Sequence, residues 1–278
     1  MEQNIYEAIV EAGRKEERIA LATIVSRTGS TPRKDAAKML VFEDGRQIGT
    51  IGGGCSEAEV SRAALLAMRT GRPQMLRFDL SDDDLENSGL ICGGSMEVYV
   101  EPILPRPALY ILGAGHVGRC LAELARPLGF NLSVVDDRVK YANRERFPQA
   151  DAIHAGAWEE VLPQLPVRDT SYLVIVTRGH AYDLVCLRFA LRSPARYIGM
   201  MGSRRKIGIF IEKLRSEGIP AEEFARVYAP VGIEIGSETP EEIAVSIAAE
   251  LIAVRKGLPA RSPKELSAPP AAQTQPNN

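Results

Sequence analysis

The stretch Leu109-Tyr110-Ile111-Leu112-Gly113-Ala114-Gly115-His116-Val117-Gly118 decides the fold of the second half of the chain. Its apolar residues have the character of a buried strand, the spacing G-x-G-x-x-G follows at once, and a helical pattern comes next. In such a strand–loop–helix unit, the first glycine makes the tight turn, the second lets the backbone approach a phosphate, and the third allows close helix packing. The sequence therefore predicts a Rossmann-type unit that binds a phosphate-bearing ligand through Gly113, Gly115 and Gly118.

A second expected strand ends in the acid that a dinucleotide site requires about twenty residues after the glycine motif. That acid is Asp136 or its neighbour Asp137, and its carboxylate would accept hydrogen bonds from ribose hydroxyls. Arg138 follows directly and would favour a 2′-phosphate, so the choice between NAD and NADP stays open. The helix N-terminus after the glycines offers free N–H groups and a partial positive charge, and it places His116 where a ligand would bind.

Beyond the glycine motif, apolar runs of strand length alternate with helical patterns. This alternation predicts an α/β domain with a parallel sheet that is covered by helices on both faces. Thr239, Pro240 and Glu242 have the spacing of a capping box and mark the start of the last helix. Strands are expected at 108–112, 132–136, 152–155, 172–177 and 197–201, and helices at 182–192, 206–217 and 240–256.

Two further loops contribute to the same predicted site, because ligands of such sheets bind beyond the carboxyl ends of the strands. The strand at 172–177 leads into Arg178, whose fork suits an anion, and His180, which can exchange a proton near neutral pH. The strand at 197–201 leads into a serine cap and adjacent cations at a helix start, a combination that favours anion binding. Its residues are Ser203, Arg204 and Arg205.

The first part of the chain predicts a smaller α+β domain over residues 1–101, with helices at 5–17 and 58–68 and short strands between and after them. Three prolines at 102–107 favour an extended linker and disfavour a central strand. The Rossmann-type domain is expected over 108–258. The residues from 259 to 278 are poor in core-forming side chains, which predicts a disordered tail.

Two cysteines lie in glycine-rich loops of the first domain. Cys55 follows three glycines, and Ser56 with Glu59 has the spacing of a capping box, which would place Cys55 just outside a helix N-terminus where the dipole favours thiolate. Cys92 precedes two glycines and a strand. Thiolates suit sulfur chemistry and heavier metals. Cys55 and Cys92 are therefore candidate metal or sulfur ligands, with a small buried hydrophobe as the alternative for each.

Composition narrows the class of protein. A formal net charge of −2 gives no reason to expect a nucleic-acid or membrane-surface partner. No stretch approaches the roughly 20 apolar residues of a membrane span, and no secretory signal begins the sequence. The four cysteines are widely separated and argue against a zinc site or a disulfide scaffold. We therefore expect a reduced cytoplasmic protein, with Cys120 and Cys186 in its core.

Taken together and in order, these motifs resemble those of the XdhC/CoxI family, the xanthine dehydrogenase accessory proteins. The resemblance extends from about Ile19 to Lys256, and no single piece of it is specific alone. The segments that carry it are Arg27–Arg33, Gly49–Glu57, Cys92–Gly94, Gly113–Gly118, Thr177–His180, Tyr197–Lys206 and Gly232–Glu242.

The resemblance implies a maturation factor with no turnover substrate of its own. Members of the family bind molybdenum cofactor, protect it while a cysteine desulfurase installs its terminal sulfur, and deliver it to a molybdenum hydroxylase apoenzyme. Molybdopterin carries a phosphate, or a pyrophosphate in its dinucleotide form, which suits the predicted anion site. Cys55 and Cys92 would then be candidate ligands of molybdenum or of the transferred sulfur. We also expect the protein to be a homodimer.

Two alternatives come from the residues themselves. An NAD(P)-dependent oxidoreductase would use Asp136 for the ribose and His180 as proton donor, although the sequence lacks a clear acid/base partner for that histidine. A nucleotide-sensing regulatory module would use the same glycine turn without chemistry.

Overall fold

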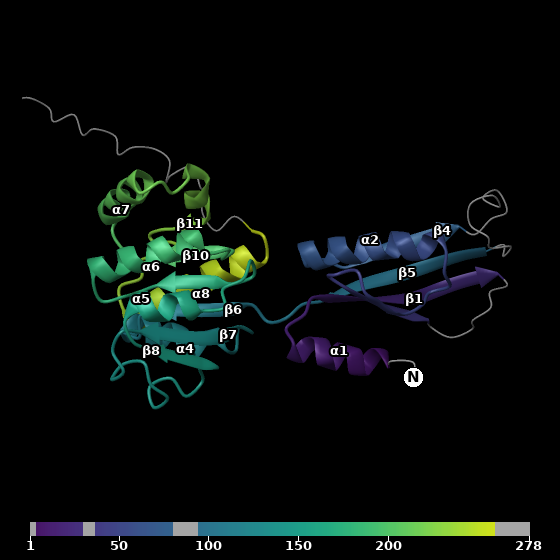
Figure 1. The fold of residues 1–278 in the computed structure, drawn as a ribbon, viewed down its shortest axis with the longest axis horizontal. Coiled ribbons are helices and arrows are strands. Elements are labelled where there is room, and N and C mark those ends of the chain that lie inside the picture. The colour runs from purple at the N-terminus through teal and green to yellow at the C-terminus, as the bar shows by residue number, and fades with distance from the viewer. Residues whose placement is uncertain (1–3, 30–36, 80–93, 259–278) are drawn as a thin grey trace, which may run out of the picture. The chain divides into compact units, whose positions relative to one another are not determined.

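The computed structural model describes residues 4–29, 37–79 and 94–258. The chain divides into two compact units, Met1–Arg106 and Pro107–Asn278 (Figure 1). Cys92 and the expected tail at 259–278 lie outside the described residues. Each unit is described below by itself.

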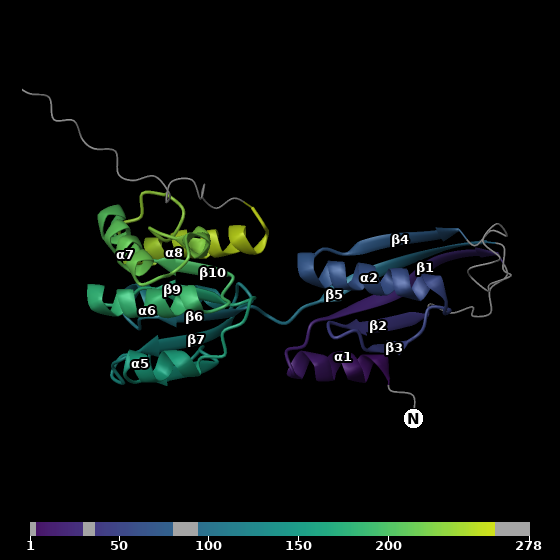
Figure 2. The ribbon, with the colours of Figure 1, turned by 45° about the horizontal axis from the view of Figure 1, so that its top comes forward.

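The first unit is an antiparallel sheet of strand order β3-β2-β1-β5-β4 with a helix on each face (Figures 1 and 2). Alternate residues of β1 divide the core, because successive side chains of a strand point to opposite faces. Ala20 and Ala22 pack under α2, whereas Ile19 packs with α1. The elements are α1 (Ile5–Arg14), β1 (Ile19–Gly29), β2 (Lys38–Phe42), β3 (Gln47–Gly49), α2 (Cys55–Thr70), β4 (Gln74–Asp79) and β5 (Gly94–Ile103).

Pro102, the first of the three prolines expected to form a linker, lies inside a strand. β5 continues through Pro102 and Ile103, where it pairs with β1 as Ala20↔Pro102 and Ile19↔Ile103. The pairing of β5 with β4 ends at Val100, so the strand is no longer central where the proline stands. A proline is tolerated at such an edge position, because the donor that it lacks has no strand to bind on that side. The connection between the units therefore comprises only residues 104–107.

The second unit has a six-stranded sheet in which every pairing is parallel, in the order β11-β10-β9-β6-β7-β8 (Figure 2). This arrangement confirms the predicted Rossmann-type fold. Its elements are β6 (Ala108–Leu112), α4 (His116–Ala125), β7 (Asn131–Asp136), β8 (Ala152–Ala155), α5 (Trp158–Val161), η2 (Leu162–Gln164), β9 (Tyr172–Ile175), α6 (His180–Arg192), β10 (Tyr197–Met200), α7 (Arg204–Ser216), η3 (Ala221–Arg226), β11 (Val227–Tyr228) and α8 (Pro240–Arg255).

Two apolar cores hold this sheet between layers of helices. Along β6, Leu109 and Ile111 pack toward the core shared with α4 and α8, whereas Tyr110 and Leu112 pack toward the core shared with α5, α6 and α7. Burial on both faces explains why the strands read as continuous apolar runs in the sequence. The capping box at Thr239 is present and begins α8. Within residues 4–29, 37–79 and 94–258, no helix is long and apolar enough to span a bilayer.

Arg226, the last residue of η3 before the edge strand β11, binds the C-terminal end of α6 through hydrogen bonds. Its guanidinium donates to the backbone oxygens of Leu191, Ser193 and Ala195 at 2.6 to 2.7 Å. These carbonyls lie in the last turn of α6 or just after it, where backbone acceptors lack helical partners.

We predict that Arg226→Met lowers the free energy of unfolding of the Rossmann unit by about 2 kcal/mol, since buried carbonyls lose charged donors. Arg192→Met removes an exposed cation at the end of α6 and should change the free energy of unfolding by less than about 0.5 kcal/mol. Urea unfolding followed through Trp158, the single tryptophan of the chain, measures both. Equal stability of the two variants would contradict this account of Arg226.

Candidate functional site

The strand order places two loops of the predicted site side by side. β7 and β8 lie on one side of β6, and β9, β10 and β11 lie on the other. The direction of the winding therefore reverses between β6 and β9, and ligands of such sheets bind where this reversal leaves a crevice outside the strand ends. The loop after β6 carries the glycine motif, and the loop after β9 carries Arg178 and His180.

The three glycines of the motif have different surroundings. A Cβ at Gly113 would lie 2.3 Å from the backbone oxygen of Val176, and the φ of Gly113 is +126°. A Cβ at Gly118 would lie 2.1 Å from the backbone oxygen of Gly113. A Cβ at Gly115 would meet nothing within 4 Å. Gly113 and Gly118 are therefore required by packing, whereas Gly115 leaves open space in front of the backbone.

The N-terminus of α4 faces this open space without a side-chain cap. Gly115 is the N-cap, the first turn contains no acidic residue, and among the described residues no side chain caps the helix start. His116 is the first helical residue and is exposed. The first amides of α4 and the positive end of the helix dipole are thus available to an anion.

Asp136 ties the glycine turn to the end of β7. It is only 1% exposed, and its Oδ2 accepts from the backbone N–H of Ala114 at 2.8 Å. Arg138 donates to both carboxylate oxygens, from Nε at 2.8 Å and from Nη2 at 3.0 Å. Burial alone would raise the pKa of Asp136, but the hydrogen bonds from Arg138 and Ala114 outweigh it and hold the pKa below its ordinary value. A ribose hydroxyl at this carboxylate would have to replace Arg138.

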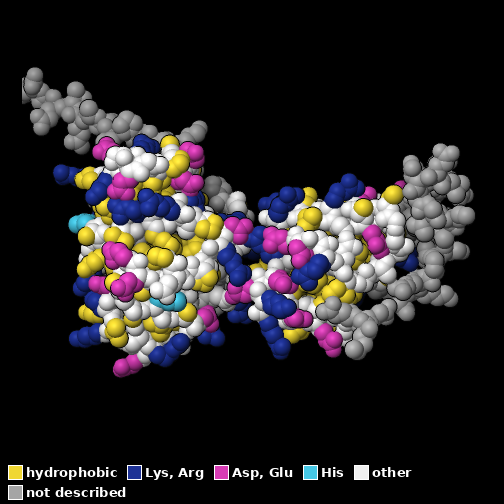
Figure 3. All heavy atoms as spheres, viewed as in Figure 1, with side chains coloured by type: hydrophobic (Ala, Val, Ile, Leu, Met, Phe, Trp, Pro, Cys, Tyr) yellow, Lys and Arg dark blue, Asp and Glu magenta, His cyan; other side chains and the backbone are white. Residues whose placement is uncertain are grey.

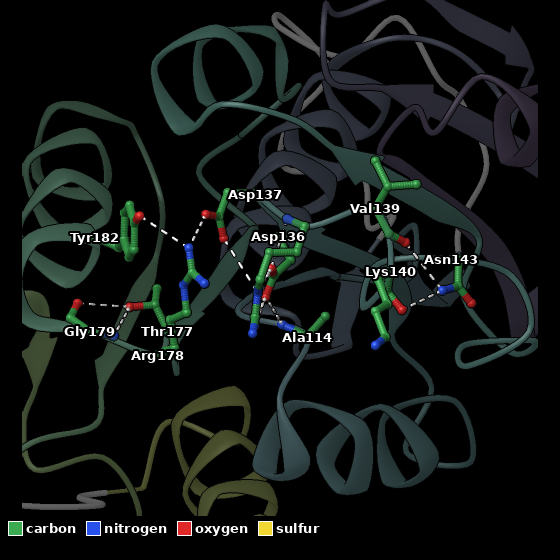
Figure 4. Close-up of polar contacts among 11 residues, drawn as sticks. Ala114, Asp136, Asp137, Val139, Lys140, Asn143, Thr177, Arg178, Gly179 and Tyr182 are labelled. Carbon is green, nitrogen blue, oxygen red and sulfur yellow. Dashed lines mark hydrogen bonds and ion pairs between the residues drawn. The ribbon is translucent and has the colours of Figure 1, made fainter.

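Asp137, the other acid considered for this position, reaches across the sheet. Its Oδ2 accepts from Nη2 of Arg178 at 2.7 Å, and the same Nη2 donates to the hydroxyl of Tyr182 at 3.1 Å (Figure 4). The guanidinium also lies 5.0 Å from the centre of the Tyr182 ring. Because β6 lies between β7 and β9, this ion pair spans the strand that ends in the glycine turn. The sequence indicated Arg178 as an anion ligand but did not predict this pairing.

A second ion pair joins the loops after β9 and β10. Asp183 of α6 is 3% exposed, accepts from the Thr177 hydroxyl at 2.7 Å and forms a close ion pair with Nζ of Lys206 in α7. Lys206 is thereby neutralised inside the protein. The spacing of acid and lysine along the chain carried no signal for this contact, because the two residues are 23 positions apart.

Arg204 and Arg205 remain as the exposed cations at the start of α7. Ser203 is the N-cap, and its side chain accepts from the backbone N–H of Lys206, as predicted. In the described ranges neither arginine has a hydrogen bond or ion pair to the protein. His180, at the start of α6, is likewise exposed. The candidate residues Ser203, Arg204, Arg205 and His180 thus all lie at helix starts along the carboxyl edge of the sheet.

Cys120 differs from its expected place in the core. It is only partly buried on α4, and its thiol contacts a carboxylate oxygen of Glu241 at 3.6 Å. Burial, followed by the charge of Glu241, raises the pKa of this thiol. Cys186 does lie fully buried in the core, as predicted, and burial raises the pKa of its thiol well above the ordinary range.

In the first unit, the turn before α2 is held by a different acid from the one expected. The N-cap is Gly54, without a side-chain hydrogen bond, so the predicted capping box of Ser56 and Glu59 is wrong. Glu57 takes this role, because its carboxylate accepts from the Thr50 hydroxyl and from two backbone amides of the glycine-rich turn. Burial would raise the pKa of Glu57, but these hydrogen bonds outweigh it and lower the pKa.

Cys55 is the first residue of α2 and is exposed. Its predicted companion, Cys92, lies outside the described residues. Among the side chains that the structure describes, no group of three or more His, Cys, Asp or Glu residues is arranged to hold a metal ion. The assignment of Cys55 and Cys92 as ligands therefore stays a prediction.

Basic and acidic side chains are mixed over the face of the Rossmann unit that Figure 3 shows, apart from a short basic row between α6 and α7. Arg188 of α6 donates to both carboxylate oxygens of Glu217, which follows α7, at 2.6 and 2.8 Å. Mixed charges of this kind produce little long-range field.

Comparison with known protein families gives this site its context. Residues 109–251 match the XdhC Rossmann domain, and residues 12–79 match the XdhC and CoxI family. The chain belongs to the XdhC/CoxI family. The glycine turn and the Arg178 loop both lie inside the matched XdhC Rossmann domain, which confirms the resemblance drawn from the motifs.

Individual relatives of this XdhC/CoxI chain agree with that membership. The uncharacterized protein YqeB of Escherichia coli K12 is 37% identical over 90% of this chain, which spans about half the length of YqeB (46%). The molybdenum cofactor insertion chaperone PaoD of the same organism is 26% identical over 84% of this chain and 83% of its own. A Bacillus halodurans crystal structure, described as a xanthine dehydrogenase, has a TM-score of 0.50 and 27% identity, with 94% of this chain and 98% of that chain covered.

The different surroundings of Gly118 and Gly115 predict that substitution by alanine affects stability at the first position and ligand binding at the second. Gly118→Ala should lower the free energy of unfolding by about 1 to 3 kcal/mol, because its methyl group collides with backbone. Gly115→Ala should cost less than about 1 kcal/mol and, if the open space at Gly115 is the anion site predicted from the sequence, should instead weaken binding of inorganic pyrophosphate. Urea unfolding and calorimetric titration measure the two effects. A Gly115→Ala protein as unstable as Gly118→Ala would refute the distinction.

Asp136 predicts a pH dependence of stability. Its folded-state pKa is lowered, so its stabilising contribution is present above the ordinary aspartate pKa of about 3.9 and is lost as the pH falls through the folded-state value. Asp136→Asn should be less stable than wild type at pH 7, and the difference should shrink as the pH is lowered toward about 3. Unfolding midpoints of both proteins from pH 3 to pH 7 test this, and a constant difference would argue against an ionised Asp136.

Proposed function

We propose that the protein is a maturation factor that binds molybdenum cofactor, holds it during sulfuration and delivers it to a xanthine dehydrogenase-like molybdenum hydroxylase. The observation that carries the proposal is the open backbone at Gly115, beside the uncapped N-terminus of α4 and next to the Arg178 loop, in a chain of the XdhC/CoxI family. The PaoD name, a molybdenum cofactor insertion chaperone, supports the same role.

The residues of the site fit the anionic end of this cofactor. Molybdopterin ends in a phosphate, or in a pyrophosphate in its dinucleotide form, and a helix N-terminus with nearby guanidinium groups binds such oxyanions. The amides after Gly115 would hold the phosphate, with Arg178, Arg204 and Arg205 as cations at the same edge of the sheet. The cofactor, once delivered, supplies the recipient hydroxylase with its molybdenum centre.

The exposed His116 and His180 stand at the starts of α4 and α6, where their rings could donate hydrogen bonds to the phosphate or the pterin. Gly113, Gly118 and Asp136 contribute indirectly by holding the turn in the shape that exposes Gly115. Cys55, exposed at the start of α2, and Cys92 are the thiols proposed to contact molybdenum or the transferred sulfur. Soft thiolates suit that task.

The partners follow from the same proposal. The apoenzyme of a molybdenum hydroxylase would receive the cofactor, and a cysteine desulfurase would supply its terminal sulfur. A homodimer in the cytoplasm is the proposed working form.

The competing function, an NAD(P)-dependent oxidoreductase, would need a free acceptor at the end of β7 for the ribose. Both oxygens of Asp136 are taken by Arg138 and Ala114. This arrangement favours an anion-binding role of the site over ribose recognition of the NAD type.

The proposal predicts that the full chain, purified anaerobically from a host that makes molybdenum cofactor, carries pterin. Oxidation should release a fluorescent pterin from wild type, and Arg178→Met should retain at least about tenfold less because a charged donor to the phosphate is lost. Cys55→Ser tests the thiol separately and should reduce the sulfurated fraction of the cofactor more than the total pterin.

Glu217→Gln is the matched control, since Glu217 belongs to an ion pair of the same unit away from the strand ends. It should retain as much pterin as wild type. If the wild-type protein carries no pterin and does not bind added cofactor, the proposed function is wrong.

A further inference from the structure

Arg178 is held by one nitrogen. Nη2 donates to Asp137 at 2.7 Å and to Tyr182 at 3.1 Å, which uses both of its hydrogens. Nε and Nη1 have no hydrogen-bond partner among the residues that the structure describes. The side chain of Arg178 is 46% exposed, whereas that of Asp137 is 17% exposed. The guanidinium thus faces outward from a partly buried carboxylate.

This geometry limits how the guanidinium can bind an anion. A phosphate is held most strongly by two parallel N–H groups, either Nε with Nη2 or Nη1 with Nη2. Both pairs include Nη2, whose hydrogens are already engaged. A phosphate that binds Arg178 in the bidentate manner must therefore displace Asp137 or Tyr182.

Asp137 is the negatively charged partner of Arg178, so it is the group with which an anion has to compete. Its other oxygen, Oδ1, lies 3.7 Å from Nε of Arg138 at the end of β7. That nitrogen already donates to Asp136 at 2.8 Å, so a carboxylate released by Arg178 is only partly compensated by Arg138. Displacement of Asp137 therefore opposes anion binding, because it leaves a partly buried carboxylate without a cation of its own.

We propose that Asp137 is a specificity-determining residue that competes with the ligand's phosphate for Arg178. This inference rests on the proposed function in so far as that function places a phosphate at the glycine turn. Because Asp137 stays beside the site when it is displaced, a monoanion gains little by taking its place at Arg178, whereas a phosphate or pyrophosphate brings at least one further charge to the helix N-terminus. The exchange favours multiply charged phosphates over carboxylates and, by keeping a competitor in place, favours their release.

Calorimetric titration of the full chain with inorganic pyrophosphate, at fixed ionic strength, tests this competition. Asp137→Asn, which keeps the shape but removes the competing charge, should bind pyrophosphate about three- to tenfold more tightly than wild type. Arg178→Met should bind it at least about tenfold more weakly. In the double variant the gain from Asp137→Asn should fall below about twofold, because the group for which Asp137 competes is absent.

Two readouts separate competition from a merely structural role. Glu217→Gln removes an acid from another Arg–carboxylate pair of the unit and should leave pyrophosphate affinity unchanged. Trp158 lies 6.4 Å from the Tyr182 ring, centre to centre, so its emission should change when pyrophosphate draws Arg178 away from Asp137 and shifts the guanidinium beside that ring in wild type.

Unchanged or weaker pyrophosphate binding by Asp137→Asn would overturn the inference, as would an equal gain in the Arg178→Met background. Wild type that carries pterin while Asp137→Asn gains no affinity would refute this inference alone. The predicted variant pattern in a protein without pterin would instead refute only the proposed function.

Discussion

The contact of Gly113 with the backbone of Val176 is the constraint on which the site depends. It brings the turn after β6 against the end of β9, so close that no side chain fits between them. Gly118 then lets α4 pack on the turn, and Asp136 fixes the turn from the other side through the amide of Ala114. These contacts aim the start of α4 outward at the one point of the sheet where the winding reverses.

Charge at this edge is organised by pairing more than by accumulation. Asp136 is shared between Arg138 and the glycine turn, Asp137 holds Arg178, and buried Asp183 neutralises Lys206. Partly buried charges are tolerated because each has a partner and further hydrogen bonds. Under the proposed function, an anionic ligand would enter a site whose cations are already positioned, and it would compete with resident carboxylates. Such competition would make binding reversible, as delivery of a cofactor requires.

Much of the fold could be predicted because local patterns and tertiary packing agree. The strands of the second unit are buried on both faces, so they stand out in the sequence as continuous apolar runs, and the helix starts at Ser203 and Thr239 carry their caps in the sequence. The sequence-based predictions were wrong where contacts with a neighbouring segment determined the local structure. β5 continues through Pro102 because β4 has ended there, and Glu57 replaces the expected Ser56 and Glu59 box because the glycine turn folds back onto it.

By itself, the sequence determined the α/β class, the family and the set of loops that meet at the carboxyl edge of the sheet. Strand periodicity and glycine spacing are local properties, which a single chain displays without its folded partners. Only the tertiary structure decided which charges those loops offer. Asp137 with Arg178, and Asp183 with Lys206, come from different elements, and their pairing depends on which strands became neighbours.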